Sequence, residues 1–143
     1  MKTKLIISAV FILSVTAYAQ NGKVPSKTRD AFAKLYPKIS EVKWSKEKDK
    51  GFEAEFKQDG KSISVVIDNE GKLLETETDI DIKELPGTVE PFINKNHPGH
   101  KITWAAKIVN EKGEVTYEVE ISKGKKHADV IFDENGNPVV KEG

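Results

Sequence analysis

Residues 63–74 read ISVVIDNEGKLL, and residues 128–139 read ADVIFDENGNPV. Each stretch is an apolar strand that ends in Asp, followed by two polar residues, a Gly and a second short run. Asp accepts hydrogen bonds from the backbone just after it, and Gly adopts the positive φ of a bulged turn, so both stretches predict a β-hairpin. A calcium loop would need oxygen ligands at alternate positions over about twelve residues, and neither stretch supplies them.

The two hairpins belong to two copies of a larger unit. In the ungapped alignment of 52–74 with 117–139, six of 23 positions are identical, whereas average composition gives roughly one or two. Each hairpin follows an alternating strand, a tryptophan strand and a short helical pattern that a proline ends. The matching stretches are FEAEF and YEVEI, VKW and ITW, and TRDAFAKLYP and TVEPFINKNHP.

This repeat predicts the fold class. We expect an α+β protein in which two tandem units, each a helix and three or four strands, form one antiparallel sheet of six to eight strands with both helices packed on one face. The first unit covers 20–79 and the second 80–143, and together they make one compact domain. Residues 75–84 are either the last strand of the first unit or a linker, and the second unit has a longer first hairpin that turns near 110–113.

The first nineteen residues, MKTKLIISAVFILSVTAYA, have the pattern of a signal peptide. Lys2 and Lys4 precede a short apolar run, and Ala17-Tyr18-Ala19 fits the small-x-small cleavage rule. The run is too short to span a bilayer, and no Cys follows it to carry a lipid. The sequence therefore predicts cleavage after Ala19 and a periplasmic or secreted protein with no membrane anchor.

Composition excludes several classes of function. Cleavage would leave 21 basic and 23 acidic residues, a net charge of −2, and a near-neutral domain with mixed signs has no electrostatic footprint for nucleic acid. The chain has no Cys, which rules out disulfides, thiolate metal sites and a Cys nucleophile.

The order of these motifs, found twice, resembles the PepSY-like family, also described as beta-lactamase-inhibitor-like. The stretches that carry the resemblance run from VPSKTRDAFAKLYP to SVVIDNEGKLL and from LPGTVEPFINKNHPG to DVIFDENGNPV. The resemblance implies an exported α+β protein with one sheet and its helices on one side. Relatives of that shape include inhibitors that grip a partner enzyme with the open sheet face, and the family offers no catalytic residues to carry over.

The histidines do not predict a metal centre or an enzyme. His97 and His100 flank a Pro-Gly turn and would need a third ligand from elsewhere, while His127 replaces Ser62 of the first unit. No G-x-S-x-G or comparable nucleophile elbow is present. We therefore expect no catalytic residues, no metal and no cofactor.

The outward face of the sheet is the most informative surface. If the apolar residues of each alternating strand point to the helix, period two places their polar neighbours outside. The candidate partner-binding residues are Glu53, Glu55, Ser64, Val66, Glu118, Glu120, Asp129 and Ile131. Carboxylates can simply keep an open face soluble, or they can select basic groups around an apolar middle.

The sequence thus predicts an exported, non-catalytic binding module that contacts an envelope or extracellular protein or peptide through this open face. The alternative is a periplasmic small-ligand or metal-binding protein that uses the histidines and carboxylates.

Overall fold

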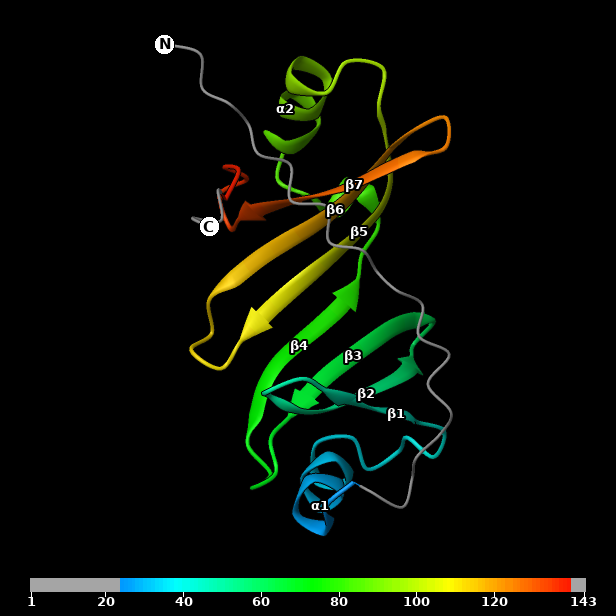
Figure 1. Cartoon of the computed structure of the whole chain (residues 1–143), viewed down its shortest axis with the longest axis vertical. Coiled ribbons are helices and arrows are strands. Elements are labelled where there is room, and N and C mark those ends of the chain that lie inside the picture. The colour runs from blue at the N-terminus through cyan, green and yellow to red at the C-terminus, as the bar shows by residue number, and fades with distance from the viewer. Residues whose placement is uncertain (1–23, 140–143) are drawn as a thin grey trace. The chain divides into compact units, whose positions relative to one another are not determined.

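The computed structural model describes residues 24–139, so the predicted signal peptide lies outside the described residues. The chain is α+β, as expected, and within residues 24–139 seven strands follow one another in one sheet in the order β1 to β7 (Figure 1). The elements are α1 (Ser26–Leu35), β1 (Lys43–Glu47), β2 (Gly51–Gln58), β3 (Lys61–Ile67), β4 (Leu73–Asp79), the 3-10 turn η1 (Ile82–Glu84), α2 (Val89–Asn96), β5 (Lys101–Asn110), β6 (Val115–Lys123) and β7 (Lys126–Asp133).

These elements form two compact units. The first unit comprises residues 24–79 and the hairpin tip Ile108–Glu114, and the second comprises Ile80–Lys107 and 115–139. The ambiguous segment 75–84 contains both a strand and a turn, because β4 runs to Asp79 and η1 follows. That both helices lie on one face of the sheet stays a prediction.

The core of the first unit lies between α1 and its strands. Thr28 and Phe32 are the buried residues of α1, four positions apart on one helix face. The ring of Phe32 lies 5.3 Å from those of Trp44 and Phe56, in edge-to-face contact with both. Alternate residues of β2 and β3 complete the cluster, with Val65 fully buried. Period two therefore directs the apolar side chains to the helix, as predicted.

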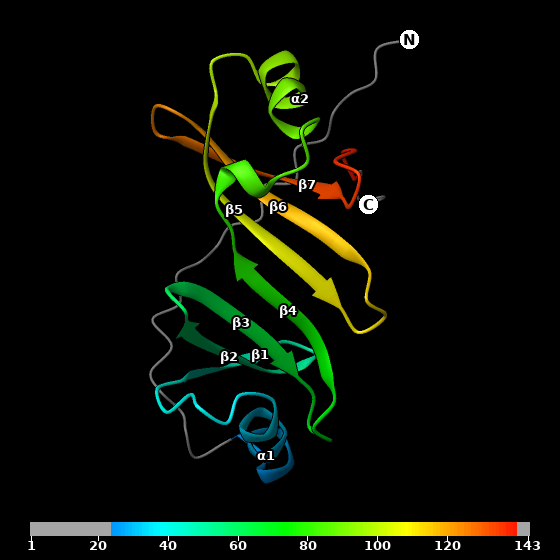
Figure 2. The same ribbon diagram turned by 180° about the vertical axis from the view of Figure 1, so that it is seen from behind.

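The core of the second unit is built in the same way around α2. Val89 and Ile93 of the helix pack with Val119 and Ile121 of β6 and with Phe132 of β7, and all five are almost fully buried. Figure 2 shows α2 beside the three strands of its own unit. The second tryptophan, Trp104, is only half-buried, unlike Trp44. The two matching tryptophans therefore differ in burial, and only Trp44 belongs to a core cluster.

The two helices end with the same backbone geometry. The residue after α1 is Tyr36, with φ −129° and ψ 64°, and the residue after α2 is His97, with φ −127° and ψ 63°. Each donates its N–H over 2.8 Å to a carbonyl four residues earlier, and each precedes a proline. Three residues later, Ile39 and His100 each donate an N–H over 3.1 Å to the carbonyl of Tyr36 or His97.

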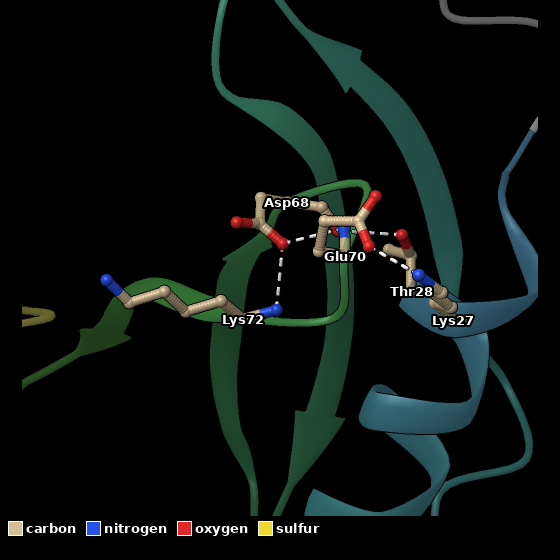
Figure 3. A network of polar contacts seen from close by, with 5 residues as sticks. All are labelled: Lys27, Thr28, Asp68, Glu70 and Lys72. Carbon is tan, nitrogen blue, oxygen red and sulfur yellow. Dashed lines mark hydrogen bonds and ion pairs between the residues drawn. The ribbon is translucent and has the colours of Figure 1, made fainter.

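A hairpin turn fixes the start of α1 (Figure 3). Asp68 Oδ1 accepts the backbone N–H groups of Glu70 at 2.9 Å and Lys72 at 2.8 Å, as expected for an Asp turn. The Thr28 hydroxyl donates over 2.8 Å to the carbonyl of Asp68, and Lys27 forms an ion pair with Glu70. The turn therefore sets the position of the helix over β3.

The second unit repeats this connection. Asp133 Oδ1 accepts the N–H groups of Asn135 and Asn137, both at 2.9 Å. The Thr88 hydroxyl, at the start of α2, donates to the carbonyls of Asn135 and Gly136 at 3.2 and 3.0 Å. Both D-x-x-G stretches are hairpin turns, as predicted.

A third turn of this kind closes the long hairpin between β5 and β6. Asn110 Oδ1 accepts the N–H groups of Lys112 at 2.9 Å and Glu114 at 3.0 Å, where the sequence predicted the turn. Glu111 forms an ion pair with Lys72 within the first unit. Between residues 24 and 139, no helix is long and apolar enough to cross a membrane.

Candidate binding surface

The surface of the first unit that faces away from α1 carries two rows of mostly polar side chains across the strands. Pairing places Ser45 opposite Glu53, Glu53 opposite Val66, and Val66 opposite Glu75. The next row runs through Lys43, Glu55, Ser64 and Glu77 in the same manner. We call these eight residues the first carboxylate face. The register thus brings four predicted residues, Glu53, Glu55, Ser64 and Val66, onto adjacent positions of one face.

Hydrogen bonds hold the two central carboxylates of this face. Glu53 accepts the hydroxyls of Ser45 at 3.2 Å and Ser64 at 2.5 Å, one from each neighbouring strand. Glu55 lies 3.5 Å from the ammonium of Lys43, and both side chains are about half exposed (48% and 54%). The Glu55 pair is therefore open to exchange with another cation, whereas Glu53 is more firmly held.

The apolar centre of the face is less accessible than the sequence suggests. Val66 is only 7% exposed, although its strand position points away from the α1 cluster. Its cross-strand neighbours are the carboxylates Glu53 and Glu75. Val66 therefore offers little surface for contact with a partner.

A hollow of about 950 Å³ lies over one end of this face. Its wall comes from the segment 38–43 that leads into β1, and its floor from the ends of β2 and β4 and the start of β3. Its charged lining residues are Lys38, Glu41, Lys43, Glu53, Glu55, Lys57, Glu77 and Asp79. The five carboxylates outnumber the three ammonium groups, so the hollow favours a cationic group.

Sequence reasoning missed the contribution of β4 to this hollow. Glu77 and Asp79 line it beside the predicted Glu53 and Glu55. The signal was present in LETETD, where acidic residues alternate at 75, 77 and 79. It was missed because 75–84 could equally be read as a linker.

The second unit carries an equivalent face on β6 and β7. Glu118 pairs with Ile131 and Glu120 with Asp129, so the other four predicted residues also meet as cross-strand neighbours. All four side chains are half-buried. We call these four residues the second carboxylate face.

The charges on the second face differ from those on the first. Glu120 accepts the Thr103 hydroxyl at 2.6 Å and lies 3.6 Å from Nδ1 of His127. Burial, and then the negative charge of Glu120, raise the pKa of the Asp129 carboxyl. Where the first unit neutralises its glutamate with Lys43, the second places two carboxylates side by side.

Both faces present hydrogen-bond acceptors and negative charge on a rigid sheet. Among residues 24–139, no cluster of three or more His, Cys, Asp or Glu has metal-binding geometry. The faces can therefore bind hydrogen-bond donors and cations.

The fold is found in solved structures of Bacteroides proteins. A DUF2874 family protein from Bacteroides uniformis ATCC 8492 aligns with TM-score 0.72 and 20% identity, over 82% of this chain and 87% of that one. A candidate periplasmic protein from Bacteroides eggerthii DSM 20697 aligns with TM-score 0.74 and 16% identity, over 82% and 86%. A BLIP-like protein from Bacteroides fragilis NCTC 9343 aligns with TM-score 0.63 and 28% identity, over 82% and 85%.

No protein-family model and no curated protein matches the sequence. The beta-lactamase-inhibitor-like (BLIP-like) fold expected from the sequence is confirmed by these neighbours.

Proposed function

We propose that the protein is an exported, non-catalytic module that binds a partner protein or peptide through its carboxylate faces. The observation that carries this proposal is the hollow of the first face, where Glu53, Glu55, Glu77 and Asp79 converge from two strands. A fold shared with a BLIP-like protein supports a role in binding rather than catalysis.

The partner carries lysine or arginine at the contact. A cation that enters the first face replaces Lys43 beside Glu55, an exchange that costs little because an exposed ion pair contributes only about 0–1 kcal/mol. A cation at the second face relieves the repulsion between Glu120 and Asp129, which adds to burial in raising the pKa of Asp129. Charge complementarity of this kind determines specificity and association rate.

Export and duplication are parts of the same proposal. The pattern of residues 1–19 and a candidate periplasmic neighbour support an extracytoplasmic location. The matching helix ends at Tyr36 and His97, and the matching Thr-to-turn hydrogen bonds, support a tandem repeat over 20–79 and 80–143. A repeat presents a related face twice, so a partner with two basic segments gains avidity.

The test is capture of the partner from the envelope fraction of the source cells, followed by an affinity measurement with the purified partner. The variant reverses one carboxylate in each face, Glu55→Lys with Glu120→Lys. We expect its affinity to fall at least 30-fold, because disrupting a charge pair at an interface costs roughly 2 kcal/mol or more. Its melting temperature should stay within about 5 °C of the wild type, since only surface contacts are lost.

A charge-matched control separates the faces from net charge. Asp30→Lys with Glu134→Lys makes the same change in charge at exposed positions on α1 and in the β7 turn. This control should bind the partner as the wild type does. Equal binding by the wild type and the Glu55/Glu120 variant would exclude the faces as the contact.

A further inference from the structure

The turn after α2 contains two histidines where the equivalent turn after α1 contains none. His97 and His100 occupy the positions of Tyr36 and Ile39, with matching backbone hydrogen bonds of 2.8 and 3.1 Å. Tyr36 and Ile39 pack against the first core. In the second unit, two imidazoles therefore occupy positions that hold core-packing side chains in the turn after α1.

Among the described residues, each imidazole has a buried nitrogen without a hydrogen-bond partner. His97 is only 6% exposed, and neither its Nε2 nor Nδ1 of His100 has a partner among the described residues. An unsatisfied buried polar atom typically costs protein stability, and native structures rarely keep one without a ligand, water or ion to satisfy it. Two such atoms in one four-residue turn call for a common explanation.

The two rings are spaced for an ion between them. Their centroids lie 5.9 Å apart and their planes are nearly perpendicular, at 78°. With metal–nitrogen bonds of about 2.0 Å, two imidazoles on opposite sides of one ion have centroids roughly 6 Å apart. A direct hydrogen bond between Nε2 of His97 and Nδ1 of His100 would bring the rings closer, and these two atoms form none.

The electrostatic surroundings favour an ion of low charge. The Lys123 ammonium donates over 3.3 Å to the carbonyl of Pro98, between the two histidines. This nearby positive charge repels a divalent ion twice as strongly as a monovalent one.

We propose that His97 Nε2 and His100 Nδ1 bind one monovalent copper ion, Cu(I), in a two-coordinate site at the end of α2. Zinc requires about four ligands, and within residues 24–139 no third His, Cys, Asp or Glu joins this pair in a metal cluster. Cu(I) accepts two nitrogen ligands in line, and imidazole is a ligand that suits copper. The site is separate from the carboxylate faces, so it stands or falls independently of the proposed binding function.

The composition makes the site easy to test. The chain has no Cys, its one Met is at position 1, and it has three histidines. Ag(I) serves as the probe because it shares the two-coordinate preference of Cu(I) and undergoes no redox reaction in air. Calorimetric titration of the purified protein with Ag(I) in chloride-free buffer should show one Ag(I) bound per chain. The Ag(I)-bound protein should melt at a higher temperature than the metal-free protein.

Two variants locate the ion. His97→Tyr with His100→Ile restores the residues of the sister turn and should weaken Ag(I) binding at least 100-fold while the protein remains folded. His127→Asn removes the histidine on the sheet surface and should leave the affinity within twofold. Without metal, the Tyr/Ile variant should melt at the same temperature as the wild type or higher, because two unsatisfied nitrogens are gone.

A nitrogen-resolved measurement completes the test. In ¹⁵N-labelled protein, one equivalent of Ag(I) should shift His97 Nε2 and His100 Nδ1 and leave both nitrogens of His127 unchanged. A competition of Cu(I) against a chelator, under ascorbate, should then give the same order of affinities among the variants. Absence of stoichiometric binding to the folded wild type, or unchanged binding in the Tyr/Ile variant, would overturn the proposal.

Discussion

Gly136 lies where the turn after β7 packs closely against the start of α2. Its φ is +78°, and a Cβ added there would lie 2.1 Å from the Thr88 hydroxyl and 2.7 Å from Cβ of Pro86. Gly113, in the turn between β5 and β6, has a φ of +80° with nothing within 4 Å of the same added atom. Alanine at the two sites therefore suffers the same backbone strain but a different collision.

The size of the difference follows from the contacts. A left-handed backbone costs an alanine about 1–2 kcal/mol at either site. At Gly136 alone, overpacking adds about 1–3 kcal/mol. Displacing the Thr88 hydroxyl, whose one hydrogen is shared between the carbonyls of Asn135 and Gly136, costs about 1 kcal/mol more. We expect Gly136→Ala to destabilise the protein by about 2–4 kcal/mol more than Gly113→Ala.

Urea unfolding followed by circular dichroism measures this difference. With a urea m-value of about 1–3 kcal/mol/M, the midpoint of Gly136→Ala should fall about 1–2 M below that of Gly113→Ala. Gly71→Ala, whose Cβ would lie 2.9 Å from the carbonyl of Lys27, should fall between them. Equal midpoints for the Gly136 and Gly113 variants would show that close packing of the turn after β7 against the start of α2 does not contribute to stability.

Three further predictions follow from the described side chains. Phe132 is the largest fully buried residue, so Phe132→Ala should lower the free energy of unfolding by about 3–5 kcal/mol in the same urea assay. Glu120→Gln should bring the pKa of Asp129 down towards its ordinary value, since Glu120 is a cause of the rise; an NMR titration of the carboxyl carbon that shows no change would contradict this. Because the pKa of His97 is lowered in the fold, the unfolded chain takes up a proton first as the pH falls below about 6.5. The stability of the wild type relative to His97→Tyr should therefore be greatest above that pH and decline below it, and parallel stability curves between pH 5 and 8 would refute the assignment.

Local sequence patterns were sufficient to predict the first helix, the hairpin turns and the faces of the strands. Phe32 lies four residues after Thr28 and Pro37 follows two residues after Leu35, so periodicity and a helix stop together placed α1. The D-x-x-G turns were equally readable, because an Asp side chain satisfies the backbone N–H groups that follow it. Alternation then assigned the faces of β2, and the register confirms that Glu53 and Glu55 lie opposite Val66 and Ser64.

The candidate site was predicted only in part, because alternation places a residue on a face but not beside a particular neighbour. The hollow depends on the segment 38–43 and on β4, which are brought to Glu53 and Glu55 by strand pairing and not by nearness in sequence. Val66 illustrates the same limit: its strand position predicts an outward side chain, yet that side chain is only 7% exposed.

The sequence by itself determined the helices, the turns and the polarity of each strand, since these depend on residues within about four positions of one another. Only the tertiary structure decided which carboxylates share a row and that Glu120 meets Asp129 and His127 instead of a lysine. It also decided that His97 and His100 each carry a buried nitrogen without a hydrogen-bond partner among residues 24–139. The physical reason is that hydrogen-bond satisfaction and the pKa of a carboxyl depend on atoms within a few ångströms in space, and a sequence pattern does not determine that distance.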